Sequence, residues 1–158
     1  MVKHFRDILL TIEIEASELF QTRAVILTKA FAAHRAGDYE LSIPVILAQA
    51  DGMGHEIFGA SPYSRHPGKI SMLSDFVKKL TGSENEDDYF KIVTRLLPIN
   101  AGSKEGSQYS SPLNRHLVLH GISTDYATEI NGLKAWAWLQ FIVSFRSAES
   151  IRRRAVLR

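Results

Sequence analysis

Residues 114–121, with the sequence NRHLVLHG, place one arginine and two histidines within about two turns of a helix. A histidine exchanges protons near neutral pH, and the planar guanidinium of an arginine grips phosphate oxygens. Cleavage of RNA without a metal needs a base for the 2′-hydroxyl, an acid for the leaving 5′-oxygen, and a cation for the charge that accumulates on the phosphate. The motif therefore contains the residue types that cleavage of a phosphodiester requires.

The motif is expected to lie on a short helix of its own. The residues that predict the ends of this helix are Ser111 as N-cap, Pro112 in the first turn and Gly121 as C-cap. Within the helix, His116 and His120 are four residues apart and share a face, whereas Arg115 and His120 lie about 140 degrees apart around the axis. Arg115 and His120 therefore converge only through the length of the arginine side chain or in a site that a second subunit completes.

This pattern, an arginine followed by a polar residue and, after four residues, by a histidine, resembles the signature of the HEPN superfamily of all-helical nucleotide-binding domains. Residues 121–131 and the apolar run 133–145 look like the turn and final helix that follow the motif in one bacterial HEPN-like group. Residues 43–52 look like the helix that packs beside it. These segments together make up roughly a third of the chain.

The resemblance implies an all-α fold in which residues 1–158 form a single HEPN-like domain, a helical bundle of about five to six helices that pairs as a homodimer. It implies a metal-independent endoribonuclease of the toxin or phage-defence type, without a cofactor and with an antitoxin protein as a further partner. Arg115 would position the scissile phosphate, His120 would act as general base or acid, and His116 would assist. Asn114 would orient a ring or cap the helix, and Asp51 would face the cleft.

Three other interpretations of the motif stay open. In the first, the bundle is a non-catalytic nucleotide-binding or protein-interaction module. In the second, the polar residues only cap and solubilise a helix, and His120 is favoured by the dipole at its C-terminal end. In the third, His116 and His120 bind a metal ion, which requires a third ligand. The candidates for that ligand are Asp51, His55 and Glu56.

Composition is that of a soluble globular protein with a core, because 45% of the residues are hydrophobic and 23% are charged. The chain has no cysteine, which excludes disulfides, thiolate zinc sites and cysteine nucleophiles. The net charge of +2 is too small to indicate nucleic-acid binding by itself, and no DNA partner is predicted. The first ten residues lack the apolar segment of a secretory signal, and no run is long enough for a membrane span, so a cytoplasmic location is expected.

Charge is distributed unevenly along the chain. An acidic run lies near the middle, at Glu84, Glu86, Asp87 and Asp88. Arginines crowd the C-terminus, at Arg146, Arg152, Arg153, Arg154 and Arg158. The basic end is interpreted either as a solvated helix end that the helix dipole favours or as a patch that steers RNA.

Hydrophobic periodicity predicts the elements that position the motif. Apolar residues recur every three or four positions over residues 2–36, which predicts one long or two consecutive helices ending at Gly37. A further helix is expected over residues 41–57, with Pro44 in its first turn and the Asp51-Gly-Met-Gly54 sequence as an interruption or end. Other segments are a loop at 59–68, helices at 70–80 and 87–97, a connection at 98–112, and a final helix centred on 133–145.

Two smaller groups of side chains are weighed against ordinary structural roles. The final helix is apolar on nearly every side, so one face is expected to meet the core and another a partner subunit, with Trp136 and Trp138 as core or interface anchors. In the loop, the residues that either reach RNA or are simply solvated are Tyr63, Arg65, His66 and Lys69.

Overall fold

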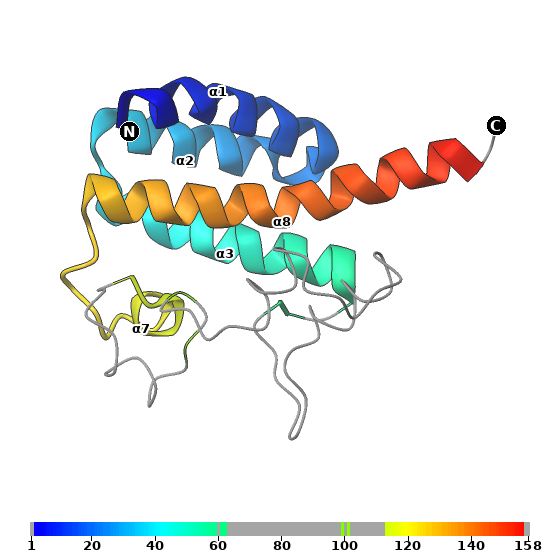
Figure 1. Cartoon of the computed structure of the whole chain (residues 1–158). Helices are drawn as coiled ribbons and strands as arrows, with labels where there is room; N and C mark the ends of the chain where they lie inside the picture. Colours follow the sequence, from blue (N-terminus) through cyan, green and yellow to red (C-terminus); the bar gives the residue numbers. More distant parts are fainter. Residues whose placement is uncertain (1, 60, 63–98, 100, 102–112, 157–158) are drawn as a thin grey trace.

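The computed structural model of the chain describes residues 2–59, 61–62, 99, 101 and 113–156, and within these residues it contains helices and turns but no strand (Figure 1). The all-α prediction is confirmed for this part. The helices expected at 70–80 and 87–97 and the loop residues Tyr63, Arg65, His66 and Lys69 lie outside the described residues, as does the connection at 98–112 except for residues 99 and 101. None of the described helices combines the length and hydropathy that crossing a membrane demands.

Residues 2–36 form two consecutive helices, one of the two arrangements that their periodicity predicts. Helix α1 spans Val2–Leu19, the short 3-10 turn η1 spans Gln21–Arg23, and α2 spans Ala24–Ala36. Gly37 follows α2 in the left-handed conformation, with φ of 85°, and its N–H donates to the carbonyl of His34. A glycine adopts this conformation without steric cost, so it ends the helix where the sequence predicts.

Helix α3 spans Tyr39–Phe58 and holds Pro44 in its second turn, not in the first turn as expected. A proline has no N–H, so the carbonyl of Glu40, four residues earlier, loses its helical donor. The hydroxyl of Tyr126 donates to that carbonyl at 3.2 Å from the segment between α7 and α8. The prediction of a first-turn proline failed because Tyr126, 86 positions further along the chain, gives the carbonyl of Glu40 the hydrogen-bond donor that Pro44 lacks.

The two glycines of α3 do not interrupt the helix, which corrects the prediction for Asp51-Gly-Met-Gly54. They allow close packing instead. A Cβ added to Gly52 would lie 2.6 Å from Nη1 of Arg23, and a Cβ added to Gly54 would lie 2.6 Å from the ring of Pro62. The Arg23 side chain lies against Gly52 and donates hydrogen bonds to Glu56 and Gln49. Each glycine is therefore a place where another side chain approaches the helix backbone.

Helix α8 spans Glu129–Val156 and forms a four-helix bundle with α1, α2 and α3 (Figure 1). It packs beside α1 and α3, while α2 closes the opposite side of the bundle. Across the centre, Phe31 of α2 stacks on Trp136 with ring centroids 3.5 Å apart, and both side chains are fully buried. Trp138 is also buried, so both tryptophans are core residues.

The apolar pattern of α8 is satisfied within the chain. Its large apolar side chains from Ala135 to Phe145 are buried or half-buried against the other described helices. The apolar character of these residues thus needs no partner subunit to explain it, while the pairing of two copies through this helix stays a prediction.

Candidate functional site

The motif begins a helix of five residues, α7, which spans Arg115–Leu119 and lies under α3, on the side away from α1 and α2 (Figure 1). Its N-cap is Asn114, not Ser111 as expected. The helix thus starts three residues later than the proline suggests. The reason is that the Asn114 side chain accepts a hydrogen bond from the N–H of Leu117 at 3.0 Å, which satisfies a donor of the first turn.

Asn114 has a structural role in this arrangement. Its side chain is 2% exposed, and besides capping α7 its Nδ2 donates to the carbonyl of Ala101 at 3.1 Å. Both ends of the amide are therefore used, and neither bond is to an imidazole. Of the two roles considered for Asn114, capping is the one that the geometry supports.

The end of α7 follows the predicted glycine signal. Gly121 has φ of 68°, and the N–H of Ile122 donates to the carbonyl of Leu117 at 2.8 Å. This closure is typical of a left-handed helix end. His120 is the last residue before it, and its N–H donates to the carbonyl of His116. The turn therefore fixes the backbone on which His120 stands.

Arg115 reaches from α7 to α3. Its Nη1 donates to Oδ2 of Asp51 at 3.1 Å, and the hydroxyl of Ser61 donates to the other oxygen, Oδ1, of the same carboxylate. The Arg115 side chain is 19% exposed and that of Asp51 is 32% exposed. Asp51, expected to face the cleft, thus holds the arginine of the motif.

The two imidazoles form a pair. His116 and His120 have ring centroids 4.3 Å apart with planes inclined by 52°. His116 is half-buried and His120 is exposed. Their four-residue spacing therefore brings them to one face, as on any helix. An imidazole pair supplies both a proton acceptor and a proton donor at one place, which is the requirement of general acid-base chemistry.

No metal site is assembled in the part of the chain that the structure describes. No three histidine or acidic side chains there are grouped so as to hold an ion. Among the third ligands considered, Asp51 is bonded to Arg115 and Glu56 to Arg23. The histidine pair thus has no third ligand among these residues.

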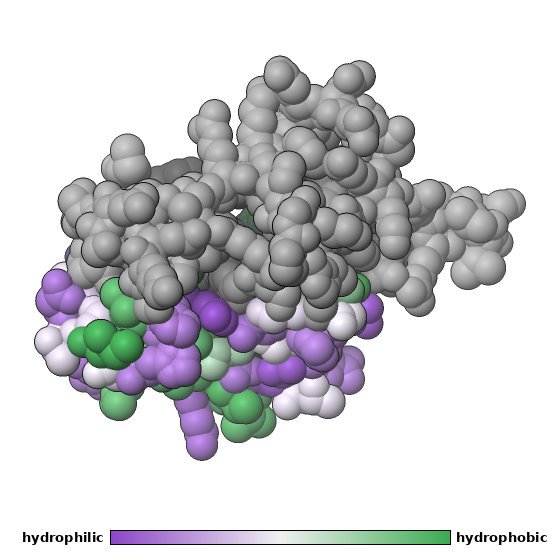
Figure 2. All heavy atoms as spheres, turned by 90° about the horizontal axis from the view of Figure 1, so that it is seen from below, coloured by the Kyte–Doolittle hydropathy of each residue, from purple (hydrophilic) through white to green (hydrophobic). Residues whose placement is uncertain are grey.

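The face on which α7 lies is chemically mixed (Figure 2). Hydrophilic and hydrophobic side chains alternate over its described part, and no single apolar patch covers it. The exposed aliphatic side chains of this region include Leu119 and Ile122, which lie within two positions of His120 in the sequence. The site is therefore a polar surface with aliphatic neighbours.

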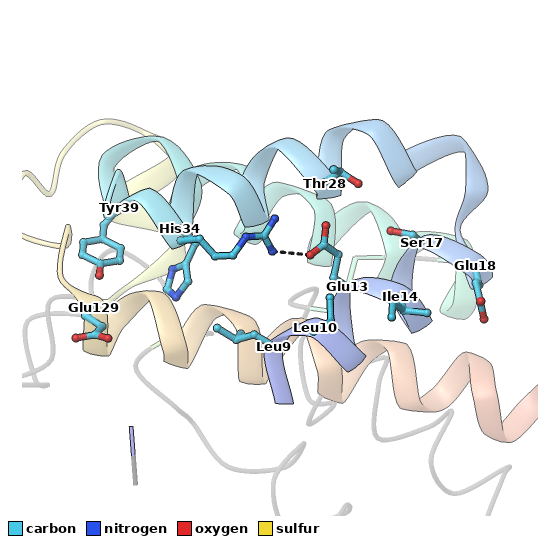
Figure 3. A pocket seen from close by; sticks show the side chains of 11 residues that line it. Leu9, Leu10, Glu13, Ile14, Ser17, Glu18, Thr28, His34, Tyr39 and Glu129 are labelled. Carbon is cyan, nitrogen blue, oxygen red and sulfur yellow. Dashed lines mark hydrogen bonds and ion pairs between the residues drawn. The ribbon is translucent and has the colours of Figure 1, made fainter. Parts of the chain in front are cut away.

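A second feature escaped the sequence analysis. A groove of about 950 Å³ runs along α1 and α2, away from α7, and eleven of the described residues line it (Figure 3). Leu10 and Ile14 line it although they are 60% and 50% exposed. The sequence signal for this groove was the spacing of four between Leu10 and Ile14. Both are aliphatic, and they lie on a helix that already buries another face.

Comparisons were made with models of protein families, with curated proteins and with solved structures. None of the three finds a match for this chain.

Proposed function

We propose that the protein is a metal-independent ribonuclease of the HEPN type, of the toxin or phage-defence class, in which the His116–His120 pair transfers the protons. The observation that carries the proposal is the imidazole pair of half-buried His116 and exposed His120, with ring centroids 4.3 Å apart, next to Arg115 on the same short helix. The pair supplies both proton-transfer groups from one chain, so the chemistry does not depend on a partner subunit.

In the proposed reaction, one imidazole takes the proton of a 2′-hydroxyl as that oxygen attacks the adjacent phosphorus. The bond from phosphorus to the 5′-oxygen breaks, and the other imidazole gives this leaving oxygen a proton. The products are a 2′,3′-cyclic phosphate and a 5′-hydroxyl. Exposed His120 is assigned the first contact with RNA, and half-buried His116 assists.

Arg115 is assigned to the phosphate. A guanidinium carries five N–H donors in a fixed plane, and the bond from Nη1 to Asp51 sets the direction of that plane. Charge that develops on the phosphate in the transition state is stabilised by a cation whose position is already fixed. Asp51 is therefore a positioning residue, and it does not touch the RNA.

The test is cleavage of a labelled RNA in the presence of EDTA by the wild type and by His116→Ala and His120→Ala. We expect each of the two variants to cleave at least about 100-fold more slowly, which is the usual contribution of an acid-base group. His55→Ala is the matched control, because His55 is also exposed but lies in the last turn of α3, and it should cleave at the wild-type rate.

The chemistry of the products makes the test more specific. Cleavage should leave cyclic phosphate ends, and a 2′-deoxy sugar at the cleaved position should block it, because the attacking hydroxyl is then absent. Equal cleavage by all four proteins, or cleavage of the deoxy position, would contradict the proposal.

A second candidate function is a non-catalytic nucleotide-binding or protein-interaction module. It is favoured by the engagement of Asn114 and Arg115 with Ala101 and Asp51, because polar side chains bonded within a domain need no substrate to satisfy them. Intact RNA with every protein, together with saturable nucleotide binding, would favour this function over the first.

A further inference from the structure

Ser61 follows α3 closely, and the chain turns back along the helix to bring it there. Gly59 ends α3 in the left-handed conformation, with φ of 73°, and its N–H donates to the carbonyl of His55 at 2.9 Å. The hydroxyl of Ser61 donates to Oδ1 of Asp51 at 2.5 Å. Asp51 lies about two helical turns before the end of α3, so Ser61 reaches it only because the chain reverses at the end of the helix.

The residue after Ser61 anchors this part of the chain on α3. Pro62 is buried, and a Cβ added to Gly54 would lie 2.6 Å from its ring. Gly54 follows Asp51 by three positions, so the two residues lie on the same side of the helix, about one turn apart. Ser61 is therefore held beside Asp51 by the packing of its neighbour as well as by its own hydrogen bond.

The two oxygens of Asp51 bind two different parts of the chain. Oδ1 accepts from Ser61, and Oδ2 accepts from Nη1 of Arg115 on α7 at 3.1 Å. The terminal torsion of an aspartate has broad preferences, so one hydrogen bond leaves the carboxylate room to turn. A second hydrogen bond, on the other oxygen, fixes the plane of the carboxylate and with it the direction in which Oδ2 meets the guanidinium.

We propose that Ser61 is a positioning residue for Arg115, which it orients through Asp51 without touching the RNA. Its effect on cleavage rests on the proposed ribonuclease function, whereas its effect on the orientation of Arg115 does not. A cation stabilises the charge that develops on a phosphate best when it is already in place, and a misplacement of about 1 Å can cost about 100-fold in rate. Ser61 thus extends the Asp51–Arg115 pair to a segment that lies outside the motif.

A second serine offers a matched comparison. Ser147 of α8 donates to Oε1 of Glu15 on α1 at 2.5 Å, and Gln140 donates to the other oxygen of that carboxylate at 3.0 Å. Like Ser61, Ser147 is half-buried and holds one oxygen of a carboxylate whose other oxygen is also bonded. The carboxylate that it holds is not the one that binds Arg115, so its removal should leave the arginine as it is.

Cleavage kinetics of Ser61→Ala, Ser61→Thr and Ser147→Ala test the proposal. We expect kcat of Ser61→Ala to fall about tenfold with KM within about twofold of the wild type, because the stabilisation that is lost belongs to the transition state. Ser61→Thr keeps the hydroxyl and should recover most of this loss, and Ser147→Ala should cleave at the wild-type rate. Circular dichroism melts check that each variant is folded.

A double-mutant cycle with Asp51→Ala separates positioning from a general structural role. If Ser61 acts through Asp51, Ser61→Ala should lower the rate by less than about twofold once the carboxylate is absent. A serine that only supports the fold would instead lower the rate by the same factor in both backgrounds.

The NMR signal of the Arg115 side chain tests the orientation without RNA. Its Nε–Hε resonance is assigned by its absence from Arg115→Gln. We expect this resonance to move in Ser61→Ala, to stay near the wild-type position in Ser61→Thr, and not to move in Ser147→Ala. If the wild type leaves RNA intact, the proposed function fails, and the resonance alone decides whether Ser61 orients Arg115.

Any of three results would overturn the proposal. They are an Arg115 resonance that does not move in Ser61→Ala, a loss of rate from Ser61→Ala that is equal with and without Asp51→Ala, and a loss in Ser61→Thr as large as that in Ser61→Ala.

Discussion

The contact of α2 with α8 and the contact of α3 with α7 hold the molecule together in different ways. In the first, Phe31 stacks on Trp136 and both side chains are fully buried. In the second, an ion pair between Asp51 and Arg115 joins two helices at partly exposed side chains. Apolar burial supplies large, non-directional stability, whereas hydrogen bonds and ion pairs add little net free energy but fix directions.

This difference separates a scaffold from a site. The bundle of α1, α2, α3 and α8 is stable because of what it buries, and α7 is oriented because of what it bonds. Substitutions in the two regions should therefore have different consequences, with loss of folding in the first and loss of orientation in the second.

Trp136→Ala should have the largest effect on stability. It removes a fully buried aromatic side chain that stacks on Phe31, and such truncations lower the free energy of unfolding by about 3–5 kcal/mol. Urea denaturation followed by circular dichroism measures the change. Ala137→Ser, at an exposed position of the same helix, is the control and should stay within about 0.5 kcal/mol of the wild type. A Trp136→Ala protein as stable as the control would show that the two regions do not differ as described.

Asn114→Ala should have an intermediate effect, a loss of about 1–2 kcal/mol in the free energy of unfolding. It removes the cap of α7 and the bond to the buried Ala101. Asn114→Ser keeps an oxygen that can accept from Leu117, so it should recover part of the loss. The same denaturation series measures both variants, and equal losses for Ala and Ser would mean that capping contributes nothing here.

The Asp51–Arg115 ion pair should have the smallest effect on stability. A double-mutant cycle of Asp51→Asn and Arg115→Gln should give a coupling energy below about 1 kcal/mol, because both side chains are partly in water. Arg115→Gln should nevertheless abolish most RNA cleavage if the proposed function holds. A coupling energy above about 2 kcal/mol would mean that the pair supports the fold as strongly as it directs the arginine.

Local signals in the sequence predicted local features. The spacing of apolar residues gave α1 and α2, Gly37 and Gly121 marked helix ends, and the spacing of four residues placed His116 beside His120. Each of these features depends on residues within about one or two turns of each other, so the chain between them fixes their geometry.

Features that depend on another element were missed or misread. Gly52 and Gly54 carry the same signal as a helix break, and only the positions of Arg23 and Pro62 reveal that they are close contacts. The bond between Arg115 and Asp51 joins residues 64 positions apart, so it depends on how α7 lies on α3. The groove beside α1 depends likewise on how α1 and α2 pack, which periodicity does not specify.

The carbonyl of Glu40 ties together two positions that lie in different parts of the chain. Replacing Tyr126 by phenylalanine costs this oxygen a hydrogen bond only while position 44 is a proline, because any other residue there brings its own N–H to the helix. The two positions are thus genetically coupled. In descendants of this sequence, replacement of Pro44 would remove the need for a hydroxyl at position 126. If Tyr126 were replaced first, the intermediate protein would be less stable, because the carbonyl of Glu40 would lose its hydrogen bond.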